Sequence, residues 1–170
     1  FNENSRFKYK DKKIKLGFIG GSFLRKGIIY LLRSLKYLSQ DNLKLYIRAN
    51  KNQIFVHREA KELCEKYNVE FISYIKNMSD FYNNIDIFIL TSIEEGFGMV
   101  LFEAMKFGLP IVATSNVGAI DNLEKNIENI EIPQKEPKAL AMQIKKLIDN
   151  PDLRYELSNN VYKKYEQLKI

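Results

Sequence analysis

Cysteine and histidine are nearly absent from this chain of 170 residues, which holds one of each, Cys64 and His57. A single cysteine excludes an internal disulfide and fits a reducing cytoplasm. One cysteine and one histidine are too few soft ligands for a zinc site, so we expect no bound metal. We interpret Cys64, on the apolar face of a predicted helix, as a core residue rather than a nucleophile.

Long apolar runs are absent as well. No stretch approaches the roughly 20 residues that a membrane span needs, and nothing resembles a signal peptide. The length is that of one domain, and an apolar content of 45% is ordinary for a globular protein. The chain opens on Phe1 rather than Met. We therefore expect a fragment of a longer protein, with residues 1–13 as a linker and residues 14–170 as a single α/β domain.

The net charge is +6, and five lysines crowd the first fifteen residues. Nucleic acid, an anionic membrane or a phosphate-bearing ligand are the partners that such a charge favours. No alternation of aromatic and basic residues follows the lysines, so we expect no nucleic-acid partner. We interpret the lysines as a solvated linker, which would lie near an anionic leaflet if the protein acted on a membrane-bound molecule.

Short β-rich apolar runs alternate with helical patterns along the chain. The predicted strands are 14–20, 43–49, 69–73, 86–90, 111–114 and 127–132; the predicted helices start near 26 and cover 55–67, 78–83, 99–107, 137–149 and 152–168. This alternation predicts a Rossmann-like parallel sheet of about six strands with helices on both faces. Ligands bind such sheets beyond the carboxyl ends of the strands, which singles out the loops 20–26, 49–53, 73–77 and 91–98.

The last of these loops carries the sequence EGFGMVLFE, from Glu95 to Glu103. Gly96 and Gly98 let a ligand approach the backbone, and the helix that follows offers free amides to a phosphate. Carboxylates only accept hydrogen bonds, so the two acids suit the hydroxyls of a sugar and a ribose. The alternative is that the acids are solvated, with Glu103 paired to Lys106 on its own helix.

The loop after the first strand reads GGSFLRKG. It matches neither the dinucleotide-binding G-x-G-x-x-G pattern nor a Walker loop. It offers Ser22 and two cations, Arg25 and Lys26, at a helix start, where a bound anion would relieve their repulsion by the helix dipole. The alternative is that both cations are ordinary surface residues.

Together these loops resemble the donor-binding, C-terminal domain of the family 4 retaining glycosyltransferases (group 1), which have the two-domain GT-B architecture. The stretch 92–114, SIEEGFGMVLFEAMKFGLPIVAT, is similar to the family's E-x7-E signature with its trailing G-x-P-V-V-A-T strand. The R-K-G of residues 25–27 resembles the family's phosphate-side loop. The resemblance covers residues 14 to about 168.

The resemblance implies a role for each matching position. Glu95 would hold the donor sugar, Glu103 the ribose, and Lys26 with Arg25 would neutralise the diphosphate as the sugar leaves, so the expected catalytic residues are Glu95, Lys26 and Arg25. The expected donor-binding residues are Gly21, Ser22, Tyr74, Ile75, Glu95, Gly96, Phe97, Gly98, Met99, Val100 and Glu103. Of these, Tyr74 and Ile75 would flank the base, and the amides of 97–100 would face the diphosphate and sugar. The donor, a UDP-sugar, is the substrate, and no cofactor is implied.

Two departures from the family pattern stand out. Gly21-Ser22 replaces an arginine that many members carry after the first strand, and Ala49-Asn50-Lys51 replaces a Gly-x-Gly after the second. The family also places its acceptor site on an N-terminal domain, which we expect to lie outside this chain. We therefore expect a half-enzyme that binds a nucleotide sugar but transfers nothing alone.

The implied full-length activity is transfer of a sugar to a glycan or lipid acceptor in the cytoplasm, with the inner face of the membrane as the place of action for a lipid acceptor. Two other functions stay open. One is a nucleotide-sugar epimerase of the same architecture. Such epimerases use histidines at the cleft, whereas His57 is predicted to lie in a helix away from the crevice. The other is a non-catalytic α/β module that binds an anionic partner.

Overall fold

The computed structural model describes residues 13–96, 98–115, 123 and 129–168. Its strands are β1 (Ile14–Ile19), β2 (Leu43–Arg48), β3 (Glu70–Phe71), β4 (Ile87–Leu90), β5 (Ile111–Thr114) and β6 (Ile130–Ile132). Its helices are α1 (Ile28–Ser34), the 3-10 turn η1 (Leu35–Tyr37), α2 (Lys51–Phe55), α3 (Arg58–Lys66), α4 (Met78–Asn83), α5 (Met99–Lys106), α6 (Pro137–Asp149) and α7 (Pro151–Leu168).

The six strands form one sheet in the order β3-β2-β1-β4-β5-β6, and every pairing is parallel. The order runs outward from β1 in one direction and from β4 in the other, as in doubly wound nucleotide-binding folds. The predicted parallel sheet of about six strands is therefore confirmed, and the strand order reverses between β1 and β4.

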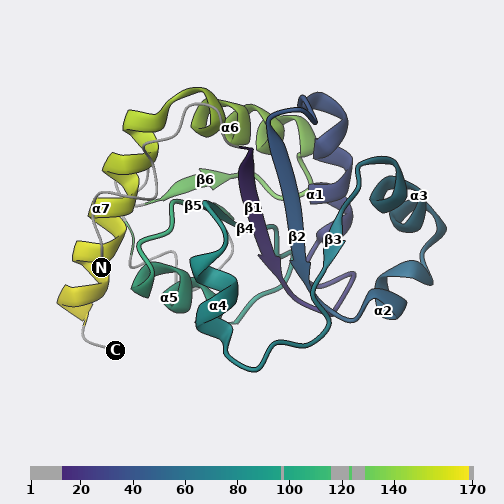
Figure 1. Cartoon of the computed structure of the whole chain (residues 1–170), viewed down its shortest axis with the longest axis horizontal. Coiled ribbons are helices and arrows are strands. Elements are labelled where there is room, and N and C mark those ends of the chain that lie inside the picture. The colour runs from purple at the N-terminus through teal and green to yellow at the C-terminus, as the bar shows by residue number, and fades with distance from the viewer. Residues whose placement is uncertain (1–12, 97, 116–122, 124–128, 169–170) are drawn as a thin grey trace.

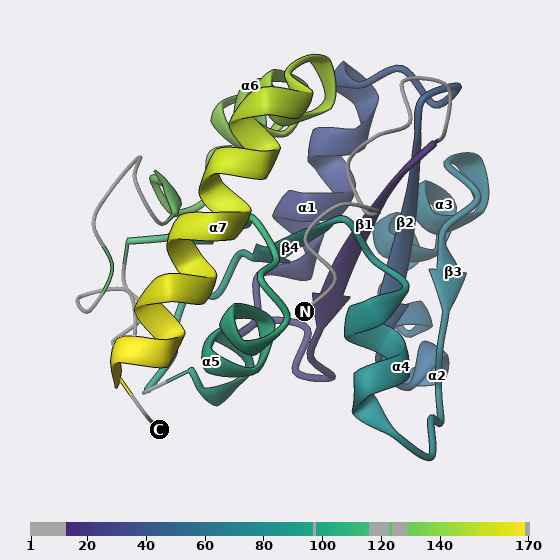
Figure 2. The same cartoon turned by 60° about the vertical axis from the view of Figure 1, so that its left-hand side comes forward.

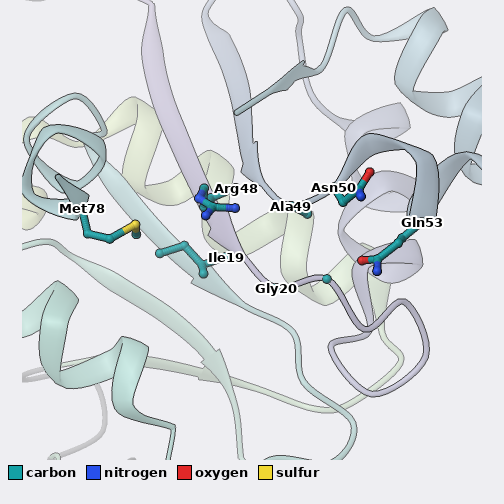
Figure 3. Close-up of a pocket in the computed structure, with 8 residues that line it drawn as sticks. Ile19, Gly20, Arg48, Ala49, Asn50, Gln53 and Met78 are labelled. Atoms are coloured by element: carbon teal, nitrogen blue, oxygen red, sulfur yellow. The ribbon is translucent and has the colours of Figure 1, made fainter. Parts of the chain in front are cut away.

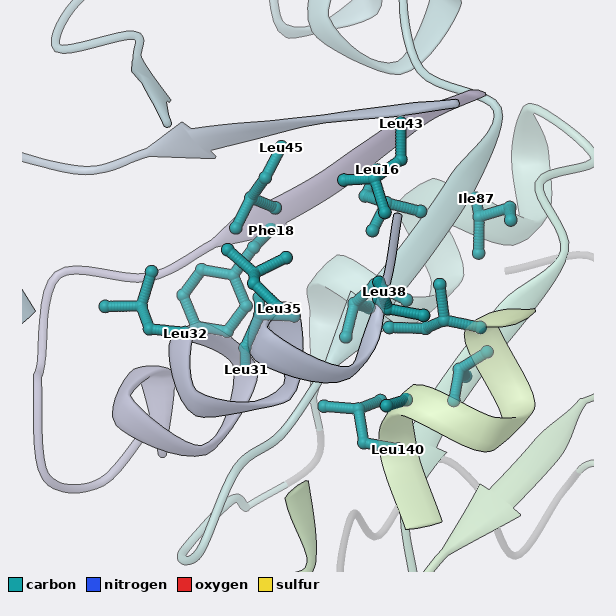
Figure 4. Packing of buried hydrophobic residues seen from close by; sticks show 14 of the residues in the cluster. Leu16, Phe18, Leu31, Leu32, Leu35, Leu38, Leu43, Leu45, Ile87 and Leu140 are labelled. Carbon is teal, nitrogen blue, oxygen red and sulfur yellow. The ribbon is translucent and has the colours of Figure 1, made fainter. Parts of the chain in front are cut away.

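Helices cover both faces of the sheet (Figure 1 and Figure 2). On one face, α1, α3 and α6 bury a cluster that includes Leu16, Phe18 and Leu45 from the sheet (Figure 4). On the other, α4, α5 and α7 bury a second cluster around Phe88 and Leu101. Each large apolar side chain buried in this way contributes about 1.5–3 kcal/mol. These two layers hold the strand ends, and so the loops between them, in fixed positions.

Local signals end and start several helices where the sequence predicts. Helix α5 ends at Lys106, with Phe107 as its C-cap, followed by Gly108 in the left-handed region with φ of 59°. Helix α6 begins with Pro137, whose fixed φ suits a first helical position. Cys64 is buried in the first core cluster, and burial raises the pKa of its thiol to about 12, which agrees with a core role.

The predicted helix over residues 55–67 is confirmed as α3, Arg58–Lys66, but it starts three residues later than predicted, and the short helix α2 precedes it. Asn50 caps α2 by accepting a hydrogen bond from the backbone N–H of Asn52 at 3.0 Å, so helix starts within the predicted loop 49–53. His57 then adopts an extended conformation and separates α2 from α3.

Three further elements differ from the prediction by more than one residue. Helix α1 begins at Ile28 rather than near residue 26, because Gly27 lies in the left-handed region with φ of 59°. The third strand shrinks to Glu70–Phe71, at the edge of the sheet, where it has one neighbour only. Of the predicted strand 127–132, the structure describes 129–132 and has Ile130–Ile132 as β6.

Residues 1–12 of the predicted linker lie outside the described residues, and Lys13 is exposed directly before β1. Within the described ranges, every helix is too short or too polar to cross a bilayer.

Candidate functional site

The loop with Arg25 and Lys26 follows β1, and the loop with Glu95 follows β4. These two motif loops therefore meet at the point where the strand order reverses. Hydrogen bonds join them. The carbonyl oxygen of Arg25 accepts from the backbone N–H groups of Ile93, at 2.7 Å, and Glu94, at 3.3 Å. The Thr91 hydroxyl donates to the carbonyl oxygens of Lys26, at 3.0 Å, and Gly27, at 3.1 Å. The loops therefore form one unit rather than two independent segments.

Lys26 and Glu95 form an ion pair in this unit. Their side chains are only 14% and 11% exposed, so water screens the pair little. The same oxygen of Glu95 accepts a hydrogen bond from the hydroxyl of the buried Ser92 at 2.9 Å. Two residues predicted from separate motifs, a phosphate-binding cation and a sugar-binding acid, are thus adjacent.

Helix α5 begins at this unit. Gly98 at its N-cap has φ of 77° and no side chain to cap the first turn. The backbone amides of Met99 and Val100 therefore point beyond the helix end without a side-chain cap, where the helix dipole favours an anion. Phe97, which the sequence also places in this group, lies outside the described residues. Gly96 is exposed and has open space around its α-carbon.

Glu103 lies one turn into α5 and is exposed. The Tyr82 hydroxyl from α4 donates a hydrogen bond to its carboxylate at 2.5 Å. The Tyr82 ring is 1% exposed and stacks on Phe107, with ring centroids 5.2 Å apart. Burial, with a further contribution from the Glu103 bond, raises the pKa of Tyr82, so its hydroxyl stays protonated and donates at neutral pH. This contact was not predicted from the sequence.

Tyr82 is therefore a positioning residue for Glu103. We expect Tyr82→Phe to weaken nucleotide binding by about 5- to 10-fold, the value of one ordinary hydrogen bond, because the carboxylate would lose its orientation. Calorimetric titration with UDP measures this. Tyr155→Phe, an exposed tyrosine on α7, is the control and should bind as the unmodified protein does. Equal affinity in both variants would contradict the positioning role.

The remaining predicted residues are mostly exposed. Gly21, Ser22 and Arg25 are exposed in the β1–α1 loop. After β3, Tyr74 is 81% exposed, whereas Ile75 packs partly against the second core cluster. Arg25 is thus less enclosed than Lys26. The structure places Tyr74 and Ile75 just before α4, the helix that carries Tyr82.

His57 does not lie inside a helix as predicted; it contacts the β1–α1 loop. Its ring stacks on Phe23 of the β1–α1 loop, with ring centroids 3.6 Å apart and planes 12° apart. The misplacement follows from the wrong helix boundary, because His57 stands between α2 and α3 instead of inside one helix. The histidine therefore supports the loop that carries Lys26.

A pocket of ≈ 380 Å³ lies beside this loop, at the carboxyl ends of β1 and β2 (Figure 3). Its lining includes Gly20 and Gly21 together with Arg48, Asn50 and Gln53. The loop after β2 was predicted from the sequence to lie at the site, but Arg48 was not. The alternation along β2 is the signal that could have found it, because Arg48 follows the buried Ile47 and so points to the other face.

No group of three or more histidine, cysteine, aspartate or glutamate side chains that could hold a metal ion occurs in the part of the chain that the structure describes.

Comparison with known proteins gives a family match over nearly the whole chain. The family model described as "Glycosyl transferases group 1" matches residues 1–164. The capsular polysaccharide biosynthesis glycosyltransferase CapM of Staphylococcus aureus is 29% identical over 169 residues, which are 96% of this chain and 44% of CapM. An α-1,4-N-acetyl-D-galactosaminyltransferase of Campylobacter jejuni, named for an undecaprenol-diphosphate-linked acceptor, is 26% identical over 90% of this chain and 44% of its own. The chain thus spans less than half the length of these relatives.

Solved structures share the fold. The C-terminal domain of the group 1 glycosyl transferase LpcC of Francisella tularensis has a TM-score of 0.80 at 19% identity, covering 98% of this chain and 92% of that domain. The structure of HepE from Anabaena with UDP and glucose has a TM-score of 0.82 at 19% identity, covering 93% of this chain and 45% of HepE. The architecture is that of the C-terminal half of the GT-B fold.

Proposed function

The chain belongs to the group 1 glycosyl transferases, and from this premise we propose that it is the donor-binding half of a retaining enzyme. The enzyme would move a sugar from a nucleotide diphosphate sugar to a glycan or lipid acceptor. The observation that carries this assignment is the Lys26–Glu95 pair, which stands beside the uncapped first turn of α5 at the switch point of the sheet.

The diphosphate would lie between Lys26 and the amides at the start of α5. Negative charge grows on the leaving nucleotide diphosphate as the bond to the sugar breaks, and a preorganised cation and helix amides stabilise that charge more than they stabilise the intact donor. Lys26 would then share its ammonium between Glu95 and the phosphate oxygens. Because the ammonium carries three donors, both contacts are possible at once.

The two acids would bind the two hydroxyl-bearing ends of the donor. Glu95 uses one oxygen for Lys26 and Ser92, so its other oxygen is available to hydroxyls of the sugar. Glu103 would accept from the ribose hydroxyls, with Tyr82 fixing its orientation. We propose UDP as the nucleotide, supported by the structures of HepE that contain UDP.

The acceptor would bind on another domain of the full-length protein. The chain covers 44% of CapM, so such relatives have room for a further domain of similar size. The undecaprenol-linked acceptor in the name of the Campylobacter jejuni relative supports a glycan or lipid acceptor. For an acceptor of this kind, the full-length enzyme would act in the cytoplasm at the inner face of the membrane.

We expect Glu103→Ala to weaken UDP binding by the full-length protein about 10- to 100-fold or more, because each charge-assisted hydrogen bond to the ribose is worth about 1.5–3 kcal/mol. Calorimetric titration gives the dissociation constant. Glu94→Ala is the matched control, since Glu94 is an exposed acid of the neighbouring loop and loses the same charge. Unchanged binding in Glu103→Ala would remove Glu103 from the donor site.

A thermal-shift panel of nucleotide sugars, followed by product analysis, tests the function itself. A ligand that binds the folded state raises the melting temperature, so the true donor should give the largest shift. Transfer leaves a free nucleotide diphosphate and an extended acceptor, whereas an epimerase would leave an altered nucleotide sugar. A polyanion-binding module would bind polyanions in a strongly salt-dependent way and tolerate alanine at both acids.

A further inference from the structure

The pocket at the ends of β1 and β2 contains a cation that the donor site described above does not use. Arg48 is the last residue of β2 and is paired with Ile19 of β1 in the parallel register. Figure 3 shows Arg48 between Met78 and Ile19 on one side and Asn50 and Gln53 on the other. The volume of ≈ 380 Å³ lies within the range of small-molecule sites.

The guanidinium of Arg48 is incompletely satisfied. Its Nε is buried, and among the described residues no group accepts a hydrogen bond from it. The described residues also give Arg48 no carboxylate partner. A buried N–H of a charged group that lacks an acceptor is costly, and a ligand oxygen that accepts from it removes that cost. The pocket is therefore prepared for a group with a hydrogen-bond acceptor.

The pocket lies next to Lys26, the cation assigned to the diphosphate. Gly20 lines it, and the stem of Lys26 lies against Gly20, where an added β-carbon would stand 2.7 Å from the Lys26 Cγ. A molecule whose phosphates contact Lys26 thus has one end within reach of the pocket.

That end is the nucleoside. Met78, which also lines the pocket, is four residues before Tyr82 on α4 and so lies on the same helix face. Tyr82 holds Glu103, the residue assigned to the ribose. Arg48 follows Tyr46 and Ile47 on β2 with alternating direction, so it shares the α4 side of the sheet with Tyr46. Through Met78 and Tyr82, α4 therefore contacts both the pocket and the acid assigned to the ribose.

We propose that Arg48 selects the base of the donor nucleotide, by donating from its buried Nε to a carbonyl oxygen of the base. The apolar Ile19 and Met78 would pack against the base. Uracil and guanine carry a carbonyl oxygen at the ring position where cytosine and adenine carry an amino group, which donates and cannot accept. The pocket thus takes a base with a carbonyl oxygen at that ring position; the C2 carbonyl, which uracil and cytosine share, gives no preference. This assignment rests on the proposed donor-binding function.

Calorimetric titration of the full-length protein with UDP, CDP, GDP and ADP tests it. If the site takes pyrimidines, we expect UDP to bind roughly 10- to 100-fold more tightly than CDP; if it takes purines, we expect the same of GDP over ADP. Arg48→Met should abolish that preference by weakening the carbonyl-bearing nucleotide alone. Arg48→Lys, which keeps the charge but lacks Nε, should also lose the preference and serves if the methionine variant folds poorly. Arg33→Met removes a guanidinium from the opposite face of the sheet and should change nothing.

Each outcome of these titrations supports or overturns the role of Arg48. A preference for CDP or ADP, or a preference that survives in both Arg48 variants, overturns the role of Arg48 and leaves the donor-binding function intact. An equal loss of affinity for all nucleotides in Arg48→Met shows general attraction of phosphate and also overturns it. If the unmodified protein binds none of the four nucleotides, the donor-binding function fails and the base pocket fails with it.

Discussion

Replacing Lys26 by methionine is expected to slow sugar transfer by the full-length protein about 100- to 1,000-fold, the usual effect of removing one preorganised group that stabilises charge in a transition state. The side chain of Lys26 is 14% exposed, so little water is available to take over its role. Most of the effect should appear in kcat rather than KM, because the charge on the leaving diphosphate is larger in the transition state than in the bound donor. Steady-state kinetics with the donor found in the thermal-shift panel measures both constants.

A structural effect of Lys26→Met can be separated from a catalytic one. The substitution leaves the carboxylate of Glu95, 11% exposed, without its cation, which lowers stability. The double variant Lys26→Met with Glu95→Gln removes that unpaired charge. We expect it to regain thermal stability without regaining transfer. Recovery of transfer together with stability would show that the pair serves the fold alone.

Arg25→Met is the comparison within the same loop. Both cations were assigned to the diphosphate from the sequence, but Arg25 is exposed and Lys26 is not. Because exposed charges are screened by water and salt, we expect a loss of about tenfold or less in transfer. A loss as large as that of Lys26→Met would place Arg25 on the phosphates as well.

The second large effect concerns the backbone that joins the loops. Gly27→Ala is expected to lower the free energy of unfolding by about 2–4 kcal/mol. The φ of Gly27 is 59°, and an added β-carbon would stand 2.1 Å from the carbonyl oxygen of Thr91. That oxygen belongs to the backbone, so the contact can be relieved only by moving the two loops apart. Urea denaturation followed by circular dichroism gives the change.

Moving the two loops apart should also displace Lys26, because the Thr91 hydroxyl donates hydrogen bonds to the carbonyl oxygens of Lys26 and Gly27. We expect UDP affinity to fall in Gly27→Ala even at temperatures where the variant stays folded. Gly96→Ala is the control: nothing lies within 4 Å of the position of its added β-carbon, so stability should change by about 0.5 kcal/mol or less. A stable Gly27→Ala variant with normal affinity would mean that the loops tolerate separation.

The sequence predicted the order of the elements because the signals for it are local. The predicted bounds of α4, β5 and α6 are those of the structure. Their signals act within a few positions of the chain: the hydrophobic period, and also Asn77 before α4, Pro110 before β5 and Pro137 in α6. The break at His57 was missed, because residues on both sides of it favour helix and only the extended backbone at His57 separates them. The two motif loops were also found by local pattern, through glycines and charges beside predicted strand ends.

The contacts that make a site of these loops were decided by the tertiary structure. Lys26 and Glu95 are 69 residues apart and meet only because β1 lies next to β4 in the sheet. Tyr82 reaches Glu103, and Arg48 enters a pocket with Met78, because α4 packs on the same sheet face as α5. Strand order and helix placement depend on how the whole chain buries its two apolar clusters, and no short stretch of sequence contains that information. The sequence by itself therefore predicted the chemical role of each residue, whereas the residue that it contacts was decided by the tertiary structure.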